Sequence, residues 1–248
     1  MKLRYSPTSP FVRKVVVLAM ELGIDKKIEM QRTNTTDPDL STQNPLGKVP
    51  SLLLDDGSSL YDSPVICAYL DSANKFHPAS GAARWTAQRR QALADGIMDA
   101  GVLGRGEMLR PAGEKSEKFL AAQKAKLNNA MNALEKEADS LGDGLDIGLI
   151  AIAAALGYMD FRYASENWRS SRPKLARWYD RFAQRPSMQT TVPRTHEPPG
   201  FRYRGSVDCA ARSETASRRR PLPGNLSRPA GRRRPRQSQP DLLLAAGG

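Results

Sequence analysis

A short stretch, Asn44–Ser63, carries the groups best suited to holding a small charged molecule. Lys48 supplies a cation, Asp62 supplies an acid, and Val49-Pro50 opens an apolar run that predicts a short strand with an exposed edge. Ser63-Pro64 predicts a helix start, because serine is a favoured N-cap and proline is tolerated at the first helical position. A cation, a strand edge, an acid and a helix N-terminus close together could hold a small zwitterionic peptide.

A second serine–proline pair, Ser9-Pro10, repeats the same helix-start pattern near the N-terminus. It places the Ser9 hydroxyl on the turn after the first predicted strand. An O–H donor combined with the positive end of a helix dipole stabilises a nearby anion. Thr8 is a rival hydroxyl at this turn, and Tyr5 is a weaker one. Ser9 could also do no more than cap the helix.

The elements that must position these residues read as a small mixed sheet with helices packed on it. The first two strands flank a helix, which implies a parallel pair with a right-handed crossover. Asp56-Gly57 is a strong hairpin signal, so the last two strands should be antiparallel. Residues 33–43 carry little helical pattern and are expected to form a loop with at most one irregular turn. The predicted strands are Lys2–Tyr5, Ile24–Met30, Val49–Leu54 and Ser59–Tyr61, and the helices are Phe11–Leu22 and Pro64–Ala73.

From Thr86 onward the apolar spacing is helical throughout. The segment that starts at Asp146 is apolar on nearly every side and should be the buried central helix. The four predicted helices are Ala87–Leu109, Glu114–Leu141, Asp146–Tyr163 and Pro173–Arg185. We therefore expect an α/β domain at residues 1–74, a linker at 75–86, an all-α domain at 87–193 and a low-complexity tail at 194–248.

The tail explains most of the basic character of the chain. It holds twelve arginines, no lysine and four acids, a net charge of +8, which leaves +4 of the total +12 for residues 1–193. Its proline and glycine content and its few large apolar residues favour disorder. A frameshifted C-terminus is the hypothesis we favour, and a basic arm that binds nucleic acid through phosphates is the alternative. No nucleic-acid partner is expected for the folded part.

The sparse cysteines and histidines exclude several classes of site. Cys67 and Cys209 form no disulfide framework, and His77 and His196 are too few for a His-based triad or a metal centre, so no metal is expected. The N-terminus lacks an apolar signal segment, and the longest uncharged apolar run, Ile147–Met159, is too short to span a bilayer. A reducing cytoplasmic location without membrane association is expected.

Taken together, Ser9-Pro10-Phe11, Lys48-Val49-Pro50 and Asp62-Ser63, followed by an all-helical region, resemble the glutathione S-transferase superfamily. The bacterial, cytosolic, serine-type members are the most similar, and the resemblance covers residues 1–193. It implies a thioredoxin-like N-terminal domain, an α-helical C-terminal domain, a homodimer and glutathione as co-substrate. Each motif is weak alone, but the set at these spacings is specific.

The resemblance also implies roles for single residues. Ser9 would donate to the glutathione thiolate; lowering a thiol pKa of about 8.5 by two pH units requires about 2.7 kcal/mol of preferential interaction with the anion. Val49-Pro50 would contain a cis bond and present backbone to the cysteinyl amide. Lys48 would meet the glycyl carboxylate, and Asp62 the γ-glutamyl ammonium. Ser63 and its helix N-terminus would bind the γ-glutamyl carboxylate.

Simpler interpretations stay open for these residues. Lys48 could be a solvated loop lysine, and Ser63 could be only an N-cap. Asp62 stands where most members carry glutamate, so its shorter side chain puts its reach in question. Cys67 is expected to be a buried packing residue. Asp146 can cap the central helix, but Leu149 replaces the acid that completes the family's capping box, so we expect lower stability without loss of activity.

The function that the resemblance implies is conjugation of glutathione to a small electrophile, a detoxification reaction. The electrophile would lie between the domains, against the helices of residues 87–114. Another glutathione-dependent reaction, such as dehalogenation, peroxide reduction or isomerisation, is one alternative. A non-catalytic stress or interaction protein of the same superfamily is the other.

Overall fold

The computed structural model describes residues 1–34 and 36–194, and its N-terminal part is built on a four-stranded sheet. The strands are β1 (Lys2–Tyr5), β2 (Glu29–Arg32), β3 (Ser51–Leu53) and β4 (Ser59–Leu60), in the order β2-β1-β3-β4. β1 pairs with β2 in parallel, with Leu3 opposite Met30, and with β3 in antiparallel fashion, with Leu3 opposite Leu52. The predicted mixed sheet with its crossover and hairpin is therefore confirmed.

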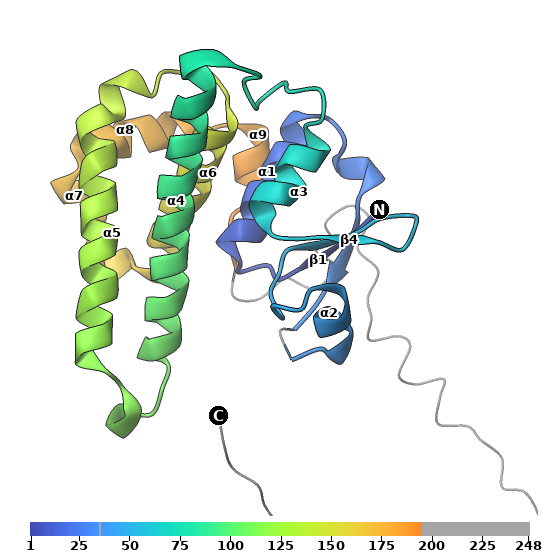
Figure 1. The fold of residues 1–248 in the computed structure, drawn as a ribbon. Helices are drawn as coiled ribbons and strands as arrows, with labels where there is room; N and C mark the ends of the chain where they lie inside the picture. The colour runs from blue at the N-terminus through green and yellow to red at the C-terminus, as the bar shows by residue number, and fades with distance from the viewer. Residues whose placement is uncertain (35, 195–248) are drawn as a thin grey trace, which may run out of the picture. The chain divides into compact units, whose positions relative to one another are not determined.

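Three helices pack against this sheet. α1 (Pro10–Glu21) and α3 (Ser63–Leu70) lie next to each other on one side, and α2 (Pro38–Gln43) lies on the other (Figure 1). The inward side chains of β1, β3, α1 and α3 form the core of this part. These fully buried residues include Leu3, Val15, Leu18, Leu52 and Ile66.

Two predictions for this part were wrong. Residues 33–43 are not a loop, since α2 forms there with Asp37 as N-cap: the Asp37 Oδ1 atom accepts from the Asp39 N–H at 2.9 Å. The helix is too short to show an apolar period, because Leu40 is its only buried residue. The second strand begins later than expected, at Glu29, because η1 (Asp25–Lys27) occupies the start of the predicted run.

The C-terminal part is helical, as predicted. Two long helices, α4 (Gly81–Met108) and α5 (Glu117–Glu137), run alongside each other, and α4 also packs on α6 (Ile147–Arg162) (Figure 1). α6 is buried from Ile147 to Met159, which confirms its central position. The remaining helices are α8 (Pro173–Phe182) and the short segments η2 (Ala112–Glu114), η3 (Ala138–Ser140), η4 (Ala164–Glu166), α7 (Trp168–Ser171) and α9 (Pro186–Thr190).

Helix α4 starts earlier than predicted and ends, as predicted, close to Leu109. It begins at Gly81, so the second half of the predicted linker is helical. It continues through Gly101 and Gly104, where other side chains approach the helix backbone closely. A Cβ atom would lie 3.1 Å from the Tyr158 ring at Gly101 and 2.9 Å from the Tyr163 hydroxyl at Gly104. These glycines therefore admit two tyrosines against the helix.

The expected cap of the central helix is present. Asp146 Oδ1 accepts from the Leu149 N–H at 2.9 Å. Within residues 1–34 and 36–194, no single helix is long and apolar enough to cross a membrane; only α6 joined to the segment Ala164–Ser171 passes by length and composition, and that pair is bent by 93°.

The sheet-bearing part and the helical part are joined through buried contacts. α1 packs on α6, and Lys14 Nζ of α1 lies 2.6 Å from Asp95 Oδ1 of α4. The Ile147 N–H donates to the Phe76 carbonyl at 2.9 Å. The domain boundaries at 1–74, 75–86 and 87–193 stay predictions. The predictions about the tail, including those for Cys209 and His196, concern residues outside the described part of the chain.

Candidate functional site

The loop before β3 presents its backbone at the end of the sheet. The Val49-Pro50 peptide bond is cis, as the resemblance implied. Asn44 is fully buried and fixes the loop: its Nδ2 donates to the Lys48 carbonyl at 2.8 Å, and its Oδ1 accepts from the Leu46 N–H at 3.0 Å. Among the described residues, neither the N–H nor the C=O of Val49 forms a hydrogen bond. This peptide edge is therefore available to a ligand.

The start of α3 differs from the prediction in an informative way. Asp62, not Ser63, is the N-cap residue, and its carboxylate makes no capping hydrogen bond. Ser63 is the first helical residue, with 1% of its surface exposed, and its Oγ atom finds no partner in the part of the chain that the structure describes. An exposed carboxylate thus stands beside a buried, unpaired hydroxyl at a helix N-terminus. The Tyr61-Asp62 bond is also cis.

Ser9 caps α1 through its hydroxyl oxygen, and its hydroxyl hydrogen remains available to donate a hydrogen bond. Its Oγ accepts from the Val12 N–H at 3.3 Å, and its own N–H donates to the Ser6 carbonyl at 3.1 Å. Because a hydroxyl that accepts a hydrogen bond still carries one hydrogen to donate, capping and stabilisation of an anion are compatible. The rival Thr8 hydroxyl lies 3.3 Å from the Ser6 hydroxyl, so the two pair with each other.

Helix α4 adds two acids that the sequence analysis did not single out. Asp95 and Asp99 lie one turn apart on this helix. Burial raises the pKa of Asp99, the charge of Lys48 lowers it, and the charge of Asp62 raises it further. Asp99 is therefore close enough to Lys48 and Asp62 for their charges to affect it. The four-residue spacing that places both acids on one side of a helix is visible in the sequence. The charged residues that act on them, Lys14, Lys48 and Asp62, come from distant parts of the chain.

The other acid, Asp95, belongs to a buried ion pair. Lys14 has no exposed side-chain surface, and its ammonium bonds the half-buried Asp95 carboxylate. Burial raises the pKa of Asp95 while Lys14 opposes that shift. The nearby Cys67 thiol is completely buried, and burial raises its pKa to about 12. Cys67 is thus a packing residue, as predicted, and has no nucleophilic character at neutral pH.

The remaining expectations have mixed outcomes. Lys48 has an exposed side chain, so its charge is accessible beside Val49. In the region of residues 87–114, Met98 is buried in the core, whereas Met108 and Leu109 are exposed at the end of α4. Among residues 1–34 and 36–194, no cluster of three or more His, Cys, Asp or Glu side chains could hold a metal ion.

With this geometry in place, comparison with other proteins defines the class. Residues 8–73 match the glutathione S-transferase N-terminal domain, and residues 117–181 match the glutathione S-transferase C-terminal domain. The chain is 36% identical over 199 residues to the uncharacterized GST-like protein YibF of Escherichia coli K12, covering 78% of this chain and 98% of that protein. The chain belongs to the glutathione S-transferase family, and its sheet-bearing part has the thioredoxin-like fold.

Solved structures of relatives agree with this assignment. A glutathione transferase family member from Pseudomonas fluorescens Pf-5, crystallised with bound glutathione, is 44% identical, with a TM-score of 0.76 over 78% of this chain and 99% of that one. A glutathione S-transferase from Methylobacillus flagellatus KT, also with glutathione bound, is 34% identical, with a TM-score of 0.70 over 78% of this chain and 99% of that one.

Proposed function

We propose that this protein binds glutathione and activates its thiol for conjugation to a small electrophile. The observation that carries the proposal is the start of α3. A γ-glutamyl group has a carboxylate and an ammonium on one carbon, and here an unpaired buried hydroxyl on a helix N-terminus adjoins the exposed Asp62 carboxylate. The hydroxyl and backbone N–H groups would take the carboxylate of the ligand, and Asp62 would take its ammonium.

The rest of the tripeptide has matching groups. The unpaired Val49 backbone would pair with the cysteinyl unit as an added strand, and Lys48 would meet the glycyl carboxylate. The bound glutathione in relatives at 44% and 34% identity supports this assignment. Asp99 adds a second negative charge on the side of Asp62, which would strengthen attraction of the ammonium.

Ser9 would then stabilise the thiolate. Its hydroxyl is at the N-terminus of α1 and keeps its hydrogen for an acceptor. The proton leaves the thiol for solvent, the Ser9 O–H donates to the sulfur, and the thiolate attacks the electrophile. Ser9 forms no covalent intermediate in this mechanism. The electrophile would approach along α4, beside Asp99.

The same proposal includes a homodimer in the cytoplasm. Val65 and Tyr69 lie one turn apart on α3, with 46% and 45% of their surfaces exposed, and a second copy would cover them. A cytoplasmic location would provide the reduced glutathione that the reaction consumes. The molar mass from light scattering tests the dimer, and a monomer at all concentrations would contradict it.

Retention on immobilised glutathione, followed by an electrophile screen of the parent and Ser9→Ala, tests the function. We expect Ser9→Ala to be retained like the parent, with kcat/KM lower by about a hundredfold, the order that a single donor to a developing anion contributes. Thr8→Val is the matched control and should keep its activity. Retention without activity towards any electrophile would instead support a non-catalytic binding protein, and no retention would contradict the proposal.

A further inference from the structure

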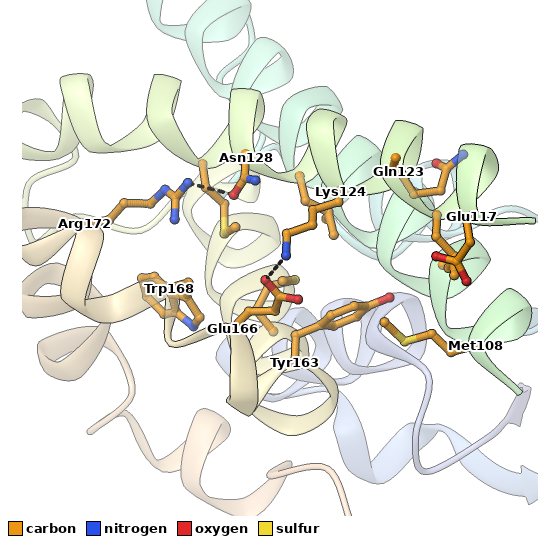
Figure 2. A pocket seen from close by; sticks show the side chains of 15 residues that line it. Met108, Glu117, Gln123, Lys124, Asn128, Tyr163, Glu166, Trp168 and Arg172 are labelled. Carbon is orange, nitrogen blue, oxygen red and sulfur yellow. Dashed lines mark hydrogen bonds and ion pairs between the residues drawn. The ribbon is translucent and has the colours of Figure 1, made fainter.

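A separate cavity lies inside the helical part of the protein. It has a volume of about 280 Å³ and is enclosed by α4, α5, the end of α6 and the segment from η4 to α7 (Figure 2). Its lining includes none of Ser9, Lys48 or Asp62. The volume lies just below the range for small-molecule sites, about 300–1,000 Å³. The cavity is therefore suited to a compact ligand and is distinct from the proposed glutathione site.

The inner wall of this cavity is apolar. Leu127 and Met131 of α5, Met159 of α6 and Trp168 of α7 all line it, and each has 5% or less of its surface exposed. The Trp168 indole is held in place by a hydrogen bond from its Nε1 atom to Asp160 Oδ1 at 2.8 Å. A flat aromatic face and flexible thioethers together suit an aromatic or branched apolar group.

One end of the cavity carries a positive charge whose direct hydrogen-bond partners are neutral. Arg172 is 6% exposed, and its three guanidinium nitrogens donate to neutral oxygens of Asn132, Ser171 and Asn128 at 2.9, 2.9 and 3.0 Å. No Asp or Glu of the described residues forms a direct ion pair with Arg172, although the negative charge of Glu135 acts on it from farther away. Because its hydrogen bonds go to neutral groups and few water molecules screen it, this buried cation still attracts an anion.

The acids that line the cavity lie at its outer rim. Glu166 is paired with Lys124 at 2.6 Å, so its charge is compensated, and Glu117 is exposed to solvent. At the far side from Arg172, Gln123 is 4% exposed and its Oε1 atom has no partner among the described residues (Figure 2). The interior thus offers a cation at one end and an unsatisfied amide at the other.

We propose that this cavity binds a small aromatic carboxylate that carries a hydroxyl group. The ligand carboxylate contacts Arg172, its ring packs against Trp168 and Met131, and its hydroxyl donates to Gln123 Oε1. The site is a binding site for a second ligand class and needs no chemistry at the glutathione site.

Isothermal titration calorimetry with 3-(4-hydroxyphenyl)propionate on the full chain tests this inference. The parent should bind one molecule per chain, and the neutral amide of the same acid should bind at least tenfold more weakly, because only the carboxylate forms charge-assisted hydrogen bonds. Equal affinity for the acid and its amide would overturn the proposal.

Two variants locate the binding site. Arg172→Gln removes the cation and should weaken binding at least tenfold. Ala121→Trp fills the rim of the cavity from the exposed face of α5 without burying a new group in the core, so it should abolish binding in a folded protein. Arg177→Gln, an exposed arginine on α8 outside the cavity, is the matched control and should bind like the parent. Unchanged affinity in Ala121→Trp would overturn the proposal, even if Arg172→Gln fails to fold.

Discussion

At the scale of single residues, the unpaired Ser63 hydroxyl is the most informative feature of the glutathione site. A buried hydroxyl without a partner costs stability, by about 1–3 kcal/mol for an unsatisfied polar group. Ser51 is also buried and unpaired, so what points to a ligand at Ser63 is its place at a helix N-terminus beside the exposed Asp62 carboxylate. Ser9 differs, because its hydroxyl accepts a hydrogen bond from Val12 and contributes to both the helix and the proposed chemistry.

Substitution of Ser63 by alanine separates its contribution to glutathione binding from its contribution to stability. We expect Ser63→Ala to raise the KM for glutathione about tenfold, since one hydrogen bond to a charged group is lost. Its free energy of unfolding should be unchanged or slightly higher, because no hydrogen bond within the described residues is broken. Steady-state kinetics and urea unfolding measure both quantities.

Ser51→Ala is the matched control, because Ser51 Oγ on β3 is also buried and unpaired but is not at a helix N-terminus. It should leave the KM unchanged. A Ser63→Ala variant with normal KM and reduced stability would show that Ser63 is only a structural residue.

At the scale of the elements, helix starts and the connection after α3 are held by short polar contacts. Asp37, Ser9 and Asp146 each cap a helix with a side-chain oxygen. Asp71, which follows α3, is almost fully buried and accepts from the N–H groups of Lys75, Phe76 and His77 at 2.8–2.9 Å. His77 Nδ1 also lies 2.7 Å from Asp71 Oδ2. This carboxylate therefore orders the chain that leads into the helical part.

These contacts make the stability of the protein dependent on pH. Burial acts to raise the pKa of Asp71, but the hydrogen bonds from His77 and from three backbone N–H groups outweigh it, and the pKa is lowered. A carboxyl with a lowered folded-state pKa stabilises the protein above its unfolded-state pKa of about 3.9, and this stability is lost as the pH falls through the folded-state value.

We expect Asp71→Asn to lower the free energy of unfolding at pH 7 by about 2 kcal/mol, as for hydrogen bonds to a charged group. The difference from the parent should shrink as the pH falls below about 4. Urea unfolding at pH 3 and pH 7 measures both, and Asp25→Asn in η1 is the control. A difference that stays constant with pH would mean that the charge of Asp71 is not involved.

At the scale of the whole described part, the sheet-bearing and helical regions are coupled by the buried Lys14–Asp95 pair. These residues are 81 positions apart in the sequence and come from α1 and α4. Breaking a buried pair is costly, because the remaining charge has no partner. Since α4 also carries Asp99, the position of this helix affects both stability and the proposed site.

Removal of one residue of the Lys14–Asp95 pair should destabilise the protein more than removal of both. We expect Lys14→Met to lower the free energy of unfolding by about 3–5 kcal/mol, with partial recovery in Lys14→Met/Asp95→Leu. Lys174→Met, which breaks the exposed Lys174–Asp139 pair of 2.5 Å, is the control and should cost less than about 1 kcal/mol. Chemical denaturation measures all three, and equal effects at both pairs would contradict the expected coupling.

Much of the fold was predictable because its signals are local. A strand, a hairpin turn or a capped helix is specified by residues within a few positions of each other, as at Asp56-Gly57 and Ser9-Pro10. The short helix α2 was missed because one buried leucine produces no period. The early start of α4 at Gly81 was missed because Ser80-Gly81 is typical of a break between elements.

The sequence by itself determined the order of the elements and the identity of Ser9, Lys48, Asp62 and Ser63 as candidates, because each lies in a motif with its own local physical basis. Only the tertiary structure decided that Ser63 is unpaired rather than capping, that the charges of Lys48 and Asp62 act on Asp99, and that Arg172 borders a cavity. These facts depend on the packing of helices far apart in the chain, and contacts of that kind leave no pattern in neighbouring residues.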